Sequence, residues 1–245
     1  VRFRVQPLPI IIYHRLSRAF GRTPALPEVP DFFLSIMKST PLKFLLNVVL
    51  ALAFTGCAAW NKYDLRQCKV TAPAGSPSVA VACVDQRESL RVGDIRPELI
   101  GVTRSGVGVP YRVKTATKAP VAKEISEVVV RGFGTNLKLA PAMFYKDVAS
   151  AKAALRGTGN DRQILVLIHR YNSDTLIRTE LDYSIKLEVY DAHGRFLATA
   201  SRTKIADLGG NFFLPAMHAR QSVIRTTGQV LTELLSAPEI RAVLE

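Results

Sequence analysis

The sequence predicts a single compact α/β domain, with a mixed sheet, a long β-hairpin and flanking helices. Three patterns predict this architecture. Residues 177–189 alternate apolar and polar side chains, residues 164–168 are all apolar, and apolar side chains recur every three to four positions within 119–133 and 215–235. Strict alternation indicates a strand with one solvent-exposed face, a short apolar run indicates a buried strand, and a spacing of three to four residues indicates a helix.

The first half of this domain contains a strand, an irregular stretch and two helices. We expect the strand at 79–84, where a β-branched run lies between turn-forming residues. Residues 85–112 contain six Gly and Pro residues, which predict a long loop or a small hairpin. A helix is expected at 119–133 and a shorter one at 147–155, with Asp147 at its start.

The second half contains the sheet centre and the longest helix. We expect the run 164–168 to be a central strand and 177–189 to pair through a turn with a partner strand at 195–203. A helix should follow at 215–235, broken by Ser236-Ala237-Pro238 before a final short turn. The α/β domain would then span 79–245, which is long enough to have its own core.

A targeting segment precedes this domain. Lys38 and Lys43 form a positively charged start, residues 44–55 are a short apolar run, and Gly56 is the small residue that follows. This order is typical of a secretory signal peptide, which we place at 37–56. A membrane-spanning helix needs about 20 apolar residues, more than this run contains.

The end of the signal peptide, Phe54-Thr55-Gly56-Cys57, resembles the lipobox of bacterial lipoproteins, with Phe54 where Leu is usual. The resemblance implies cleavage between Gly56 and Cys57 and acylation of Cys57, so that membrane lipid is a partner. Two or more acyl chains anchor a protein stably, since each buried methylene contributes about 0.8 kcal/mol. Ala58 after the cysteine implies the outer membrane, and the expected localisation is lipid-anchored and periplasm-facing.

Residues 1–36 precede the expected signal peptide. A signal peptide normally begins a chain, so we interpret residues 1–36 as a mis-annotated extension, and a genuine basic N-terminal arm is the alternative.

The full chain of 245 residues has a net charge of +13. Residues 1–56 carry seven basic and two acidic side chains, which leaves +8 on the other 189 residues. Export argues against the nucleic-acid partner that such a charge first suggests, so none is expected.

Residues 57–78 are rich in Ala, Pro, Gly and Ser, which predicts a lipid anchor and tether. Two cysteines remain beside Cys57. In an oxidising periplasm Cys68 and Cys83 could form a disulfide that joins the tether to the first strand. Alternatively, Cys83 is buried and Cys68 is free and exposed.

Motifs of catalysis and metal binding are missing from the sequence. It contains no Gly-x-Ser-x-Gly, no phosphate-binding loop and no His-Glu-x-x-His. The histidines His169, His193 and His218 have no ligand spacing. We therefore expect no cofactor, no metal and no enzymatic activity.

One group of residues is a candidate loop or binding site: Asp85, Arg87, Arg96 and Gly101. Asp85 and Arg87 end the first strand and could brace the following loop through charge-assisted hydrogen bonds. Alternatively, four arginines could form a basic rim for an anionic ligand: Arg87, Arg91, Arg96 and Arg104.

The lipobox, a strand ending in Asp85-Gln86-Arg87, the nearby Ile100-Gly101 and the order helix, strand, hairpin, helix resemble the YajG-like bacterial lipoproteins. This resemblance implies a periplasm-facing, outer-membrane-anchored protein without a known reaction. We expect a non-enzymatic binding or structural module whose partner is an envelope protein or an anionic polymer. The alternative function is a cell-wall hydrolase that uses Asp85.

Overall fold

The structure is a computed structural model, and it describes residues 61–73, 78–105, 108–134, 143–145 and 147–245. All described residues belong to one compact unit. Residues 1–36, the segment 37–56 that we expect to be a signal peptide, and Cys57 with its neighbours Gly56 and Ala58 lie outside the described residues. Among the helices that the structure describes, none is long and apolar enough to cross a membrane.

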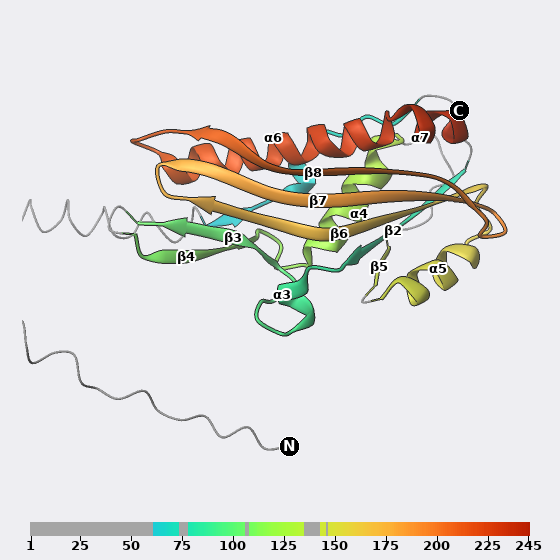
Figure 1. Cartoon of the computed structure of the whole chain (residues 1–245), viewed down its shortest axis with the longest axis horizontal. Coiled ribbons are helices and arrows are strands. Elements are labelled where there is room, and N and C mark those ends of the chain that lie inside the picture. The colour runs from blue at the N-terminus through green and yellow to red at the C-terminus, as the bar shows by residue number, and fades with distance from the viewer. Residues whose placement is uncertain (1–60, 74–77, 106–107, 135–142, 146) are drawn as a thin grey trace, which may run out of the picture. The chain divides into compact units, whose positions relative to one another are not determined.

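The described part of the chain forms one mixed eight-stranded sheet (Figure 1). The strands are β1 (Lys62–Tyr63), β2 (Val79–Asp85), β3 (Leu99–Arg104), β4 (Pro110–Thr115), β5 (Met143–Tyr145), β6 (Arg162–Thr175), β7 (Arg178–Asp191) and β8 (Phe196–Gly210). Their order is β1-β4-β3-β6-β2-β5, and β7 pairs with β6 and with β8. Both β2 and β3 are parallel to β6, whereas β7 is antiparallel to β6 and to β8. The predicted α/β class and mixed sheet are confirmed.

Helices cover the sheet where the sequence places apolar stripes. They are η2 (Leu65–Gln67, a 3-10 turn), α3 (Glu88–Arg91), α4 (Val121–Gly132), α5 (Val148–Arg156), α6 (Pro215–Leu235) and α7 (Pro238–Leu244). The carboxylate of Asp147 accepts a hydrogen bond from the Ser150 amide at 2.8 Å and caps α5 as predicted. The helices expected at 119–133, 147–155 and 215–235 are therefore confirmed within one or two residues at each end.

The alternating strand β7 separates a buried face from a wetter one. Its inward side chains, among them Leu181, Ile185 and Leu187, join α4, α6 and α7 in the larger core cluster. The opposite face of β2 and β6 packs against Ala151 and Leu155 of α5 in a smaller cluster. The sheet is thus covered by helices on one face and only partly covered on the other.

Several elements extend beyond their predicted ends. The central strand β6 continues to Thr175, because Tyr171, Ser173 and Thr175 still point inward and are buried while the positions between them are less so. Polar residues in this stretch hide the alternation. The stretch 85–112 contains the predicted small hairpin, formed by β3 and β4, although β4 continues to Thr115. The expected final short turn is the helix α7.

Part of the predicted tether belongs to the fold. Tyr63 and Leu65 are fully buried, and β1 adds a parallel strand beside β4. The amide of Leu65 also donates a hydrogen bond to the buried carboxylate of Glu124 on α4 at 2.9 Å. The folded region therefore includes residues that precede its expected start at 79, because these few apolar side chains contact partners that are distant in sequence.

Candidate functional site

The residues Asp85, Arg87 and Gly101 lie at a seam in the sheet. One edge of β6 pairs first with β2, over residues 162–168, and then with β3, over residues 173–175. Between these two partners the backbone of β6 has a register shift near Ile168. Backbone carbonyls at such a change of partner need other donors, because an unpaired buried carbonyl is costly.

Arg87 supplies these donors from a buried position. Its guanidinium donates to the carbonyl of Leu99 at 2.6 Å and to that of Tyr171 at 3.2 Å. The same group forms a bidentate ion pair with the Asp85 carboxylate, with a shortest N–O distance of 2.7 Å. Both side chains are about 5% exposed. The pair thus ties the end of β2 to β3 and β6, which is the arrangement that the brace alternative expects.

Gly101 allows β3 to approach β6 closely. A Cβ atom built at this position would lie 1.9 Å from the carbonyl oxygen of Ser173, far inside any real contact. Gly101 and Ser173 are register partners where β3 begins to pair with β6. The glycine is therefore required by the packing of the seam.

The alternative of a four-arginine basic rim is wrong. Arg87 is buried in its pair with Asp85, and Arg104 pairs with Asp174 at 2.6 Å. Of these four arginines, Arg91 and Arg96 are exposed and form no ion pair with the residues that the structure describes. The rim does not form, because two of its four charges are neutralised by carboxylates that are close only in the folded sheet.

The two remaining cysteines do not form the disulfide considered above, since both Cys68 and Cys83 are free and buried. The expected exposure of a free Cys68 is also wrong, because its thiol packs against α6. Cys83 lies on β2, and the thiol of Cys68 donates to the carbonyl of Ile224 on α6 at 3.2 Å. Burial raises the pKa of the Cys68 thiol to about 12. This thiol therefore stays protonated near neutral pH and acts as a small packing group.

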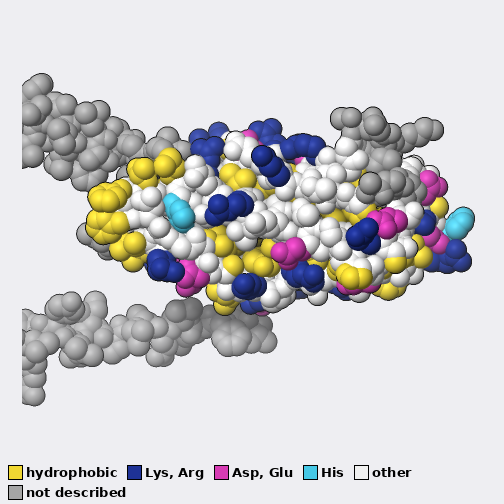
Figure 2. All heavy atoms as spheres, turned by 90° about the horizontal axis from the view of Figure 1, so that it is seen from above, with side chains coloured by type: hydrophobic (Ala, Val, Ile, Leu, Met, Phe, Trp, Pro, Cys, Tyr) yellow, Lys and Arg dark blue, Asp and Glu magenta, His cyan; other side chains and the backbone are white. Residues whose placement is uncertain are grey.

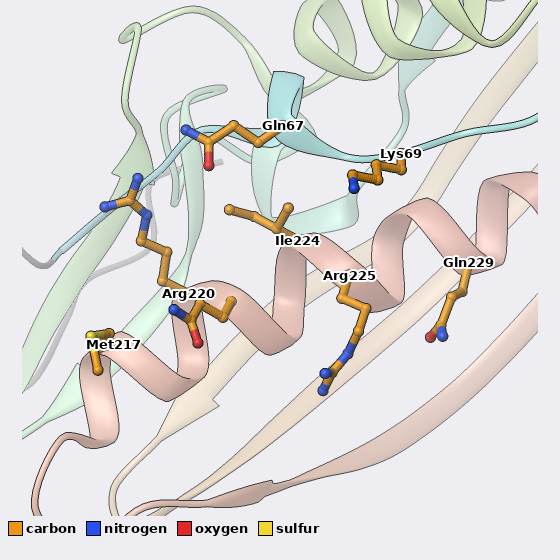
Figure 3. Close-up of a pocket in the computed structure, with 8 residues that line it drawn as sticks. Gln67, Lys69, Met217, Arg220, Ile224, Arg225 and Gln229 are labelled. Atoms are coloured by element: carbon orange, nitrogen blue, oxygen red, sulfur yellow. The ribbon is translucent and has the colours of Figure 1, made fainter.

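The candidate site is a hollow whose lining includes none of the seam residues. It is a groove of about 740 Å³ between α6 and the segment around η2. The residues that line it are Gln67, Lys69, Met217, Arg220, Gln221, Ile224, Arg225 and Gln229. Figure 3 shows Arg220 and Ile224 extending from α6 toward the segment that carries Gln67 and Lys69. We call this hollow the basic groove.

The sequence builds the groove from one long helix and one short segment. Pro215 occupies the first turn of α6, where its missing amide hydrogen costs no hydrogen bond. Opposite residues of α6, including Val223, Val230 and Leu231, are buried against the sheet. That apolar stripe turns the lining residues outward, toward the chain that follows η2. The close approach of Gly228 to the backbone of Lys69, whose oxygen a Cβ atom would meet at 2.6 Å, brings the two walls together.

The electrostatics of the basic groove favour anions. Lys69, Arg220 and Arg225 are cationic, none of the eight lining residues is acidic, and none of the three cations forms an ion pair among the residues that the structure describes. Three glutamine amides lie among them and offer both donors and acceptors. Guanidinium groups recognise carboxylates and phosphates through paired hydrogen bonds, so this arrangement can hold an anionic, hydroxyl-rich ligand.

Sequence reasoning missed this groove. The available signal was that Arg220 and Arg225 lie outside the apolar stripe of the predicted helix, which indicates two cations on its exposed face. Lys69 and Gln67 belong to the predicted tether, and nothing in the sequence places them beside a helix 150 residues further on.

No group of three or more metal-ligating side chains occurs within the described ranges. His169 is exposed at the seam, and the ring Nε2 of His218 donates to the carbonyl of Leu208 at 3.1 Å. His193 is exposed in the turn between β7 and β8. The three histidines therefore stand apart in the fold, in keeping with their spacing in the sequence.

Comparisons with known proteins give low similarity. No family model and no curated protein matches the chain. Among solved structures it is similar to a DUF330 protein, XCC0632 from Xanthomonas campestris, at 17% identity over 71% of this chain and 92% of that chain, with a TM-score of 0.44. It is also similar to the PelC dodecamer from Paraburkholderia phytofirmans, at 15% identity over 68% of this chain and 94% of that chain, with a TM-score of 0.35.

A third solved structure is itself a lipoprotein, GNA1162 from Neisseria meningitidis. The chain matches it at 15% identity over 60% of this chain and 96% of that chain, with a TM-score of 0.26. Likenesses of this strength do not establish what this chain binds or does.

Proposed function

We propose that the protein is a bacterial envelope lipoprotein, anchored in the outer membrane through acylated Cys57, and that its periplasm-facing domain is a non-enzymatic module that binds an anionic envelope polymer. The signal segment 37–56 and the Cys57 motif support the anchor. The finer assignment to YajG-like lipoproteins belongs to this proposal and depends on the residues quoted for that resemblance.

The observation that carries the binding function is the basic groove. Among the residues that the structure describes, its cations form no ion pair, so an external anion can pair with them. The lining combines these charges with amides and two apolar side chains, Met217 and Ile224. Such a mixture suits a polymer that presents carboxylates or phosphates along a backbone of sugar rings.

The alternative of a hydrolase based on Asp85 has less support. Both carboxylate oxygens of Asp85 accept hydrogen bonds from Arg87. A general base or nucleophile needs a free lone pair within reach of substrate. Asp85 is better suited to hold the seam, so no reaction is part of the proposal.

The anchor is tested in cells with globomycin, which inhibits the lipoprotein signal peptidase. We expect an uncut precursor to accumulate, and we expect a Cys57→Ser variant to lose metabolic labelling with palmitate. Labelling that persists in the Cys57→Ser variant, or processing that ignores globomycin, would contradict the anchor.

The groove is tested with purified protein, isolated peptidoglycan sacculi and one defined probe, polygalacturonate, with neutral dextran as the uncharged comparison. An Arg220→Gln/Arg225→Gln variant should bind the anionic polymers at least about tenfold more weakly, since each charged hydrogen bond contributes about 1.5 kcal/mol or more. The matched control is Arg91→Gln/Arg96→Gln, which removes the same charge from exposed positions elsewhere. Equal losses in both variants, or no binding of the anionic polymers by the parent protein, would contradict the groove.

A further inference from the structure

A second surface of the molecule is apolar and exposed. Phe212 is 74% exposed, Phe213 86% and Ile177 48%, and Leu176 and Leu214 are also more than 40% exposed. These five residues form what we call the apolar tip. Figure 2 shows hydrophobic side chains gathered at one end of the molecule. A contiguous group of large exposed apolar side chains marks an interaction surface, whereas single ones do not.

The apolar tip consists of two connections that lie side by side. One is the turn between β6 and β7, with Leu176 and Ile177, and the other is the loop between β8 and α6 (Figure 1). Arg178 and Gly210 are register partners at the ends of β7 and β8. A Cβ atom on Gly210 would lie 2.2 Å from the carbonyl oxygen of Ile177, so the two backbones are in close contact.

Three backbone amides of the tip have hydrogen-bond acceptors close by in the chain. The side-chain oxygen of Asn211 accepts hydrogen bonds from the amides of Phe213 and Leu214, at 2.9 Å each. The amide of Leu176 donates to the carbonyl of Arg178 at 3.2 Å and closes the other turn. Backbone groups that enter a medium without water need such partners, because each unsatisfied one costs several kcal/mol. The tip can therefore leave water without exposing these amides.

The chain enters the fold from the same end. Strand β1 is parallel to β4, with Lys62 opposite Lys114, so its N-terminal side faces the start of β4 at Pro110. Pro110 pairs with Arg104, and the neighbouring Thr103 pairs with Thr175, one residue before the tip. The β3–β4 hairpin turn and the apolar tip therefore lie at one end of the sheet, toward which the N-terminal side of β1 is directed.

The chain between Cys57 and β1 is long enough for an anchored Cys57 to lie beside the tip. Cys57 is four residues before Asn61, where the described chain begins, and four residues reach at most about 14 Å. Lys114 of β4 lies opposite Lys62 of β1. It is also four residues, or about 13 Å along the strand, from Pro110 at the tip end of β4. An acylated Cys57 can therefore hold the tip at the membrane surface.

We infer that the apolar tip inserts into the interfacial layer of the same phospholipid leaflet that holds the acyl chains of Cys57. The inference rests on the proposed lipid anchor and adds a second, non-covalent contact to it. Aromatic and aliphatic side chains of interfacial segments lie about 5–10 Å into the boundary between headgroups and acyl chains. Because the anchor keeps the tip at high local concentration beside the lipid, even a weak insertion is populated.

Insertion would orient the domain. With β6, β7 and β8 ending at the lipid surface, the β7–β8 turn and α7 point away from the membrane into the periplasm. The basic groove begins at Met217, in the first turn of α6 directly after the tip, and extends along that helix. The groove would then open close to the membrane and lead away from it.

The test uses the full acylated protein, purified in detergent and reconstituted into vesicles of phosphatidylethanolamine and phosphatidylglycerol. A Phe213→Cys variant is labelled with an environment-sensitive fluorophore, since Cys68 and Cys83 are buried and the Cys57 thiol carries lipid in the proposed mature protein. The matched control is Phe196→Cys. Phe196 is also an exposed phenylalanine, 55% exposed, but it lies beside the β7–β8 turn at the opposite end of the strands.

We expect nitroxide-labelled phospholipid to quench the label at position 213 by roughly half or more and to leave the label at 196 nearly unchanged, as insertion to interfacial depth requires. In a second variant the label is at Leu176→Cys, with Phe212→Ser and Phe213→Ser added. Its quenching should fall to the level of the 196 control while its thermal unfolding stays that of Leu176→Cys alone.

Flotation of the vesicles separates the two claims. Protein that floats but is not quenched at position 213 overturns tip insertion and leaves the lipid anchor standing. Protein that does not float overturns both the anchor and the insertion that depends on it. Shielding of the label from lipid nitroxide and from aqueous acrylamide alike, rising with protein concentration, would identify a second copy of the chain as the occupant and would also overturn the inference.

Discussion

Removing the Arg87 side chain should strongly destabilise the fold, because the seam of the sheet depends on it. In Arg87→Ala the Asp85 carboxylate stays buried without a cation, and the carbonyls of Leu99 and Tyr171 lose their donor. Breaking a buried ion pair costs about 3–5 kcal/mol, within a total stability of about 5–15 kcal/mol for a domain. We therefore expect a loss of about 4 kcal/mol in the free energy of unfolding.

Urea denaturation, followed by far-ultraviolet circular dichroism, measures this loss. With a slope of about 2 kcal/mol per molar urea, the midpoint should fall by about 2 M. The matched control is Arg104→Ala, which breaks the ion pair with Asp174, whose side chains are 40% and 38% exposed. An exposed pair contributes about 0–1 kcal/mol, so the control midpoint should move by about 0.5 M or less.

The decisive comparison is between these two variants. A midpoint for Arg87→Ala within about 0.5 M of the Arg104→Ala value would refute the reasoning that the seam needs a buried guanidinium. A double-mutant cycle with Asp85→Ala separates the pair from the carbonyl contacts. Asp85→Ala in the Arg87→Ala background should cost little more, because the unpaired buried carboxylate is then gone.

Two further predictions concern the seam and the buried thiol. Gly101→Ala should lower the free energy of unfolding by about 1–3 kcal/mol in the same urea assay, because the new methyl group overlaps the Ser173 carbonyl. An unchanged midpoint for Gly101→Ala would contradict the close approach of β3 to β6. The raised pKa of Cys68, about 12, keeps the thiol protonated from pH 7 to 9. Its reaction with Ellman's reagent in this range should be slow in native protein and fast in urea. A Cys68→Ser variant should have one slowly reacting thiol fewer, because the buried Cys83 remains. Rapid labelling of Cys68 in the native protein would show that the site is open.

The sequence by itself determined the class of the fold and most of its elements. Alternation along 177–189 and helical spacing along 215–235 are local signals, because a half-buried strand or helix repeats its apolar face with the period of its backbone. Asp147 capped its helix as predicted for the same reason, since capping involves only the next few residues. The pairing of Asp85 with Arg87 is local too, and one of the two alternatives considered for it describes the structure.

Only the tertiary structure decided which of the other residues act together. The sequence could not show that Arg104 is neutralised by Asp174, 70 residues away, that Cys68 packs on α6 instead of joining Cys83, or that Lys69 and Arg220 line one groove. These contacts depend on strand order and register, and local periodicity carries no information about either. The apolar tip did leave a trace, the run Phe212-Phe213-Leu214 between turn-forming residues, but its exposure follows only from where the two strand ends meet. Local chemistry thus specified the elements, and long-range packing determined which surfaces remained available for partners.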